Sequence, residues 1–141
     1  MPATVTRRQQ SRELGYAEIT TTVSGIVSTT LIDVTGLSLS NLVIPTDRPV
    51  LVRAYVAYAS NATANATVAL AIMSSDGVTN YGTATIISAT ANARVPLQVV
   101  KRFAAGACPT ALKVQVDVGS GTGTLACGAP IAPAFLQVTA L

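Results

Sequence analysis

The 141-residue chain contains no histidine and only two cysteines. Without histidine it lacks the usual general base near neutral pH, the partner of Ser-His and Cys-His nucleophile pairs, and the commonest transition-metal ligand. Cys108 and Cys127 stand alone, with no second pair to complete a zinc motif. The sequence therefore predicts a protein that is not an enzyme and that uses no metal or cofactor.

Charged side chains are scarce as well, at 11% of the residues, against roughly a quarter in typical soluble proteins. Thr, Ser, Ala and Asn occupy the positions where Lys and Glu would be usual. Such a surface favours a protein that hides much of its exterior against copies of itself or a larger assembly. The alternative is a β-domain with a Thr-rich coat.

Long apolar runs are also missing, since no run approaches the ~20 uninterrupted apolar residues that a spanning helix needs. The basic start of the chain, with Arg7, Arg8 and Arg12, is not followed by the apolar stretch of a secretory signal. We therefore expect no membrane partner and synthesis in a cytoplasm. The net charge of +3 and six aromatic residues predict no specific nucleic-acid binding.

A cytoplasmic origin argues against a disulfide between Cys108 and Cys127, which we expect to be buried, reduced thiols. The glycine-rich stretch 119–123 is followed by strand-forming residues and by no Lys, so it is not a phosphate-binding loop. We expect it to turn a hairpin, which would place Cys108 opposite a residue near Pro133.

The segment RPVLVRAYVAYAS, residues 48–60, predicts a central strand. Alternation along a strand places one set of side chains on an inner face and the other on a face that suits a second subunit. Arg53 and Tyr55 are the candidates for that subunit interface. The inner set is Val50, Val52, Ala54, Val56 and Tyr58, and the outer set is Leu51, Arg53, Tyr55, Ala57 and Ala59.

Further strands are predicted by alternation and by turn residues, with a hairpin at Asp76-Gly77, a bulge at Gly82 and an edge at Pro96. The sequence thus predicts an all-β fold, an antiparallel two-sheet β-sandwich of jelly-roll kind, with a barrel as the alternative. The expected strands are 14–23, 26–34, 36–44, 48–60, 67–75, 78–88, 94–104, 110–118, 124–128 and 134–141.

Residues 1–12 lack periodicity and form a basic, extended N-terminal arm, followed by the sandwich domain over residues 13–141. The arm is either a disordered end or an anchor that orders on an acidic partner. The scattered carboxylates, such as Glu13 with Glu18 or Asp33 with Asp47, are better explained as exposed or turn residues than as a glycosidase pair.

Four segments, ELGYAEITTTV, DVTGLSLS, DRPVLVRAYVAYAS and FLQVTAL, together resemble the small β-sandwich modules of virion proteins from tailed bacteriophages, most of all phages that infect actinobacteria. Such modules occur as capsid decoration proteins, head fibres or minor tail proteins. The resemblance implies an oligomeric, non-enzymatic protein that joins the virion after synthesis in the host cytoplasm. It makes Arg7, Arg8 and Arg12 candidates for contact with the virion body.

Two functions follow as expectations. The first is a capsid decoration protein, a homotrimer on the outer capsid surface that binds the major capsid protein and stabilises the shell. The second is a minor tail or head-fibre module that binds a host-surface glycan or receptor. Its available stacking residues are Tyr16, Tyr55, Tyr58 and Tyr81.

Overall fold

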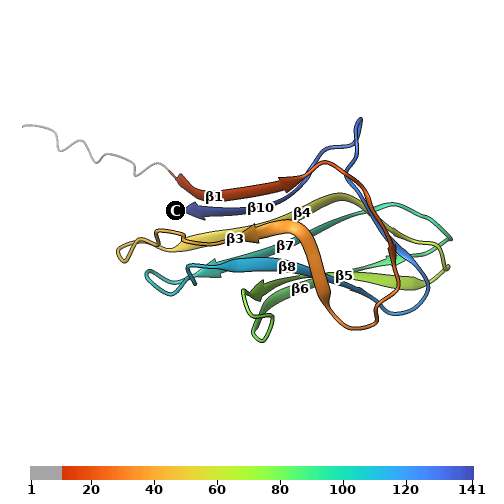
Figure 1. Ribbon diagram of the computed structural model, residues 1–141, viewed down its shortest axis with the longest axis horizontal. Coiled ribbons are helices and arrows are strands. Elements are labelled where there is room, and N and C mark those ends of the chain that lie inside the picture. Colours follow the sequence, from red (N-terminus) through yellow and green to blue (C-terminus); the bar gives the residue numbers. More distant parts are fainter. Residues whose placement is uncertain (1–10) are drawn as a thin grey trace, which may run out of the picture.

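The computed structural model describes residues 11–141, which form ten β-strands joined by turns and loops. Within this range no helix is present that could cross a membrane. The strands are β1 (Arg12–Ile19), β2 (Val23–Ile26), β3 (Ile32–Leu39), β4 (Val50–Asn61), β5 (Ala66–Ser74), β6 (Asn80–Ser88), β7 (Val95–Phe103), β8 (Leu112–Val118), β9 (Gly123–Ala126) and β10 (Ala134–Ala140) (Figure 1).

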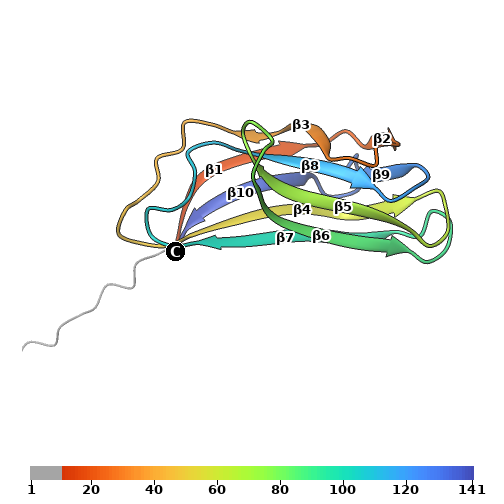
Figure 2. The ribbon, with the colours of Figure 1, turned by 90° about the horizontal axis from the view of Figure 1, so that it is seen from below.

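The strands form two antiparallel sheets that run lengthwise along the molecule (Figures 1 and 2). One sheet has six strands in the order β1-β10-β4-β9-β2, with β7 paired to the other side of β4. The second has four strands in the order β3-β8-β5-β6. The predicted all-β, two-sheet sandwich of jelly-roll kind is confirmed.

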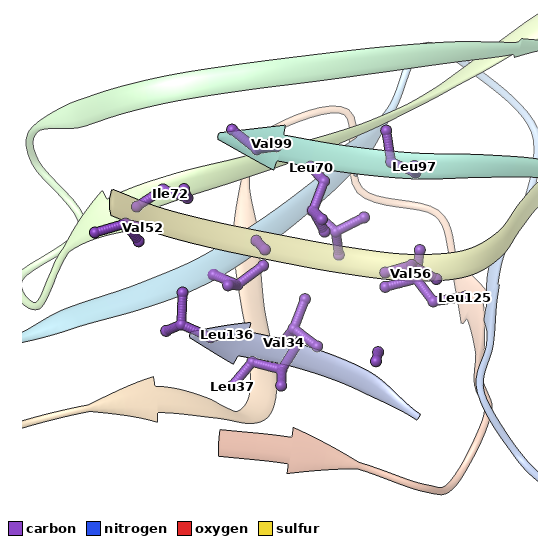
Figure 3. Packing of buried hydrophobic residues seen from close by; sticks show 14 of the residues in the cluster. Val34, Leu37, Val52, Val56, Leu70, Ile72, Leu97, Val99, Leu125 and Leu136 are labelled. Carbon is purple, nitrogen blue, oxygen red and sulfur yellow. The ribbon is translucent and has the colours of Figure 1, made fainter. Parts of the chain in front are cut away.

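β4 is the central strand of the larger sheet, because it pairs with β10, β7 and β9. Its inward residues meet those of β5 and β8 in a continuous apolar core, part of which is drawn in Figure 3. Val52, Val56, Leu70 and Leu136 are completely buried there. Each such side chain stabilises the fold by about 1.5–3 kcal/mol relative to exposure, so the inner face of β4 holds the two sheets together.

The predicted faces of β4 hold only as far as Val56. The pairing with β7 shifts between Val56 and Ala59, and such an irregularity reverses the alternation beyond it. Tyr58, predicted on the inner face, is 39% exposed, whereas Ala57 and Ala59, predicted on the outer face, are buried. The prediction was therefore wrong for these three residues, and Tyr58 lies on the same outer surface as Tyr55.

Several strand boundaries near the N-terminus also differ from prediction, and one strand, β3, over Ile32–Leu39, takes the place of the expected strands 26–34 and 36–44. The expected strand over 14–23 ends at Ile19, and a new strand, β2, begins at Val23 and pairs with β9. The expected break at Thr35-Gly36 is absent because β3 continues through Gly36, which has a φ of 93° and lies in an irregular part of the pairing with β8. Glycine tolerates this φ, so the strand bends without ending.

The prediction that the glycine-rich stretch 119–123 turns a hairpin was wrong. This stretch carries the chain from β8 in the smaller sheet to β9 in the larger one. The buried Asn61 side chain fixes this crossing, since its amide donates to the carbonyl oxygens of Ser120 (2.8 Å) and Thr67 (3.2 Å). Periodicity marks where a strand ends but not which sheet the next strand joins, so this connection could not be predicted from the local sequence.

Other turn predictions are confirmed. Asp76 and Gly77 lie in the turn between β5 and β6, where the Asp76 carboxylate accepts a hydrogen bond from the Val78 amide (3.0 Å). The β5–β6 pairing is irregular opposite Gly82. Pro96 lies in β7, which pairs with β4 alone among the described strands. Cys108 and Cys127 are both buried and unpaired, as expected.

Candidate functional site

The outward side of the larger sheet carries a regular array of side chains, which we call the outer face. Strand pairing aligns β1, β10, β4 and β7 so that their outward residues form three rows across the sheet. All twelve are exposed or half-buried. The rows are Glu13, Thr139, Leu51 and Arg102; Tyr16, Gln137, Arg53 and Val100; and Glu18, Phe135, Tyr55 and Gln98.

Three aromatic rings form a ladder across this face. Phe135 on β10 stacks on Tyr16 of β1, with ring centroids 5.7 Å apart, and on Tyr55 of β4, with centroids 5.3 Å apart. The Arg53 guanidinium carbon lies 5.1 Å from the centroid of the Phe135 ring. Cross-strand aromatic pairs of this kind stabilise a sheet and leave a rigid, amphipathic surface.

Polar side chains connect the same three strands. The Gln137 amide nitrogen donates to the Glu13 carboxylate (2.7 Å), and the Gln137 oxygen accepts a hydrogen bond from Arg53 (3.4 Å). The Tyr16 hydroxyl donates a hydrogen bond to the Glu18 carboxylate (2.9 Å). The pKa of Tyr16 is raised, first by partial burial and second by this hydrogen bond. These hydrogen bonds hold the polar side chains in place around the ladder.

A shallow depression of about 450 Å³ adjoins the ladder, and we call it the tyrosine pocket. The irregularity in β4 turns Tyr58 outward, and the loop before β10 supplies Pro130 and Ile131 as a wall. Arg94 lies over the Tyr58 ring, with its guanidinium carbon 5.8 Å from the ring centroid. The lining residues are Tyr55, Ala57, Tyr58, Pro96, Pro130, Ile131 and Ala132.

The residues singled out from the sequence lie in different places. Arg53 and Tyr55 are neighbours on the outer face, opposite Gln137 and Phe135, and their place in a subunit interface stays a prediction. Arg12 begins β1 and, with Asn41 and Arg48, lines a separate hollow beside the last strand. Arg7 and Arg8, and with them most of the predicted arm, lie outside the described residues.

Tyr81, one of the four tyrosines considered for stacking, is not on the outer face. Its ring packs edge-on against Phe103, with centroids 5.3 Å apart, and supports the core. Phe135, the centre of the ladder, was not predicted as a site residue. The alternation of Phe135, Gln137 and Thr139 against buried Leu136 and Val138 was the signal in the sequence that could have indicated its outward position.

The carboxylates do not form a catalytic pair. Glu13 and Glu18 each accept a hydrogen bond from a neighbouring side chain, with Tyr16 between them on β1. Asp33 is paired with Lys113 (2.8 Å) rather than with Asp47, and hydrogen bonds from Lys113 and Gln115 lower its pKa. Within residues 11–141, no three His, Cys, Asp or Glu side chains cluster to hold a metal ion.

Neither thiol has the character of a nucleophile. Burial raises the pKa of Cys108 to about 11 and also raises that of Cys127. The Cys127 thiol donates to the Thr21 carbonyl oxygen (3.1 Å). A reactive cysteine needs a lowered pKa and access to solvent, so these side chains serve the core.

The chain matches no family model and no curated protein. Among solved structures, a carbohydrate-binding module of Cellvibrio mixtus lichenase 5A in complex with cellotriose is 11% identical, over 89% of this chain and 96% of that chain, with a TM-score of 0.40. A two-module part of Clostridium thermocellum xylanase 10B, complexed with xylohexaose, is 10% identical over 94% of this chain, with a TM-score of 0.44. The match spans 29% of that second chain.

Proposed function

We propose that this protein is a non-catalytic binding module of a tailed-phage virion and that it recognises a glycan on the host surface. The observation that carries the proposal is the tyrosine pocket, where Tyr55 and Tyr58 border one open depression beside the aromatic ladder. The virion setting rests on the resemblance of the sequence to phage β-sandwich modules. The scarcity of charge supports a protein that works within a larger assembly.

The chemistry of the pocket suits a sugar ring. Ligand sites combine an apolar, partly aromatic lining with a few polar groups that fix orientation. Here the tyrosine rings, Pro96 and Ile131 supply apolar surface for the C–H groups of a pyranose. Arg94, held over Tyr58, and the tyrosine hydroxyls supply hydrogen-bond groups for sugar hydroxyls.

A glycan array probed with the purified protein tests this proposal, followed by titration of the best oligosaccharide by NMR. We expect millimolar to micromolar binding, with shifts in the amides of β4 and of the loop before β10. Tyr58→Ala should weaken binding about fivefold or more, because an aromatic side chain that stacks on a flat ring, as in nucleobase sites, is worth about 1–3 kcal/mol by alanine substitution. Tyr58→Phe should retain most of the affinity.

Val78→Ala provides the control, since Val78 is 79% exposed on the β5–β6 turn, away from the lining residues. Its affinity should equal that of the unmodified protein. If no oligosaccharide binds at millimolar concentration, or if Tyr58→Ala binds as well as Val78→Ala, the tyrosine pocket is not a glycan site.

A second candidate is the capsid decoration role, in which the protein joins the outside of the shell and bridges major capsid subunits. The low charge of the chain favours this role, because uncharged surface loses little free energy of hydration when an assembly buries it. Virions that lack this protein should then assemble normally but lose thermal or mechanical resistance. Unchanged resistance of these virions would contradict the decoration role and favour the glycan-binding module. Density for the protein on the tail in a cryo-EM map of the particle would do the same.

A further inference from the structure

The outer face separates its charges by strand. Its two acids, Glu13 and Glu18, both lie on β1 at one edge, while its two arginines, Arg53 and Arg102, lie on β4 and on the opposite edge strand β7. Among residues 11–141, the one salt bridge joins Lys113 to Asp33, on the other sheet. Across the face the charge thus changes from acidic on β1, through β10 with the Phe135 ring, to basic on β4 and β7.

Such an array is complementary to its own copy in one orientation. Rotation by 180° about an axis parallel to the strands, between β10 and β4, reverses the order of the strands but keeps the three rows in place. β1 of one copy then lies over β7 of the other, and β10 lies over β4. This rotation brings Glu13 to Arg102 of the second copy, Gln137 to Arg53, Phe135 to Tyr55, and Tyr16 to Val100.

The alternative two-fold arrangement is unfavourable. An axis across the strands would place each strand over the same strand of the second copy and reverse the order of the rows. Glu13 would then face Glu18 and Arg53 would face Arg53, while Arg102 would face Gln98 and gain no acidic partner. Like charges brought together in this way suppress a wrong pairing. The charge pattern therefore selects the axis parallel to the strands.

We propose that the outer face associates with the outer face of a second copy of this chain through this two-fold axis. Two copies of the sheet would lie face to face with aligned strands, a packing that twisted sheets adopt readily. Arg53 and Tyr55 would both lie at the contact. The inference does not depend on glycan binding, because most of the tyrosine pocket lies beyond the row of Phe135 and Tyr55.

The size of the face sets the expected strength. Strands about 4.8 Å apart and a rise of about 3.4 Å per residue give an area of roughly 20 Å by 20 Å, or ~400 Å² per copy. This is about half of a standard protein interface, which places the association among weak ones. We expect a dissociation constant between roughly 10 µM and 1 mM that rises with salt, since the edge pairs are exposed to solvent.

Sedimentation velocity between 10 µM and 1 mM, at low and at high salt and without any glycan, measures this association. Glu13→Arg and Arg102→Glu should each weaken it at least tenfold, because each replaces two symmetry-related attractions by repulsions. An equal mixture of the two variants should associate again, since the Arg at position 13 then meets the Glu at position 102 and the two native residues meet each other. Asp47→Arg, which reverses an exposed acid in the loop before β4, should leave association unchanged.

The restored mixture is a result that only the proposed axis gives. A protein that stays monomeric at 1 mM overturns the proposal and leaves the face to a different partner, such as the capsid. An association that neither variant weakens also overturns the proposal. The same holds for an association that both variants weaken but that their mixture does not restore. Circular dichroism of each variant shows whether it is folded. Glycan titration at 10 µM protein tests the tyrosine pocket separately.

Discussion

Replacing Asn61 with alanine should destabilise the protein more than almost any other single polar substitution. Asn61 is completely buried at the end of β4. Its amide nitrogen donates to the carbonyl oxygens of Thr67 and Ser120, and its oxygen accepts a hydrogen bond from the Thr63 amide (2.9 Å). One side chain thus joins the turn after β4 to the crossing between the sheets.

The magnitude follows from what alanine leaves behind. The Thr67 carbonyl still accepts a hydrogen bond from the Gly119 amide (3.3 Å), so two backbone groups, on Thr63 and Ser120, lose the partner that Asn61 gave them. Each such loss costs about 1–3 kcal/mol when the group is shielded from water, and less when water can reach it. Asn61 itself is buried but Thr63 and Ser120 are exposed residues, so we expect the free energy of unfolding to fall by about 1–3 kcal/mol, and the melting temperature by about 5–10 °C for a domain of this size.

Urea denaturation followed by circular dichroism measures this change, with Asn80→Ala as the matched control. Asn80 also makes two side-chain hydrogen bonds, to Thr83 and to the Gly82 amide, but it is exposed, so water can replace them. Its substitution should cost less than about 1 kcal/mol. Equal losses for the two variants would show that the Asn61 network does not hold the sheets together.

Three further predictions concern the face, the ion pair and the thiols. Phe135→Ala should lower the free energy of unfolding by about 1–3 kcal/mol in urea denaturation, because two stacked pairs are lost; Val100→Ala on the same face should cost less. Asp33→Asn should cost less than about 1 kcal/mol at pH 7. Since the folded pKa of Asp33 is lowered, the unmodified protein's advantage is present above pH ~4 and should disappear as a pH series falls through the folded pKa. Cys108 and Cys127 should react with a thiol reagent at pH 8 only after unfolding; rapid labelling of the native protein would contradict their burial.

The sequence was informative wherever structure depends on near neighbours. The alternation of Leu112, Val114, Val116 and Val118 predicted β8 and its buried side, because a strand buried on one face requires that pattern. Asp76-Gly77 predicted its turn through backbone preference alone. The outward position of Arg53 and Tyr55 followed from the same alternation in β4.

Features that depend on distant segments could not be predicted in this way. Tyr58 was placed on the wrong face because the irregularity that reverses it is defined by the pairing with β7. The ladder joins Tyr16, Tyr55 and Phe135, whose adjacency requires the register of three strands far apart in the chain. The wall of the tyrosine pocket, at Pro130 and Ile131, comes from a loop without periodicity.

The few charged residues of the chain are unevenly distributed over the outer face. The chain has nine Lys and Arg and six Asp and Glu residues. Four of them lie on this face, with the two acids on the edge strand β1 and the two arginines on β4 and the edge strand β7. A face that only needed solubility would gain more from mixed signs, which reduce repulsion within each edge. Sorted charges instead favour one orientation of a partner over its reverse. In the association that we propose, the outer face therefore divides into four charged residues that orient the second copy and an aromatic ladder that supplies contact area.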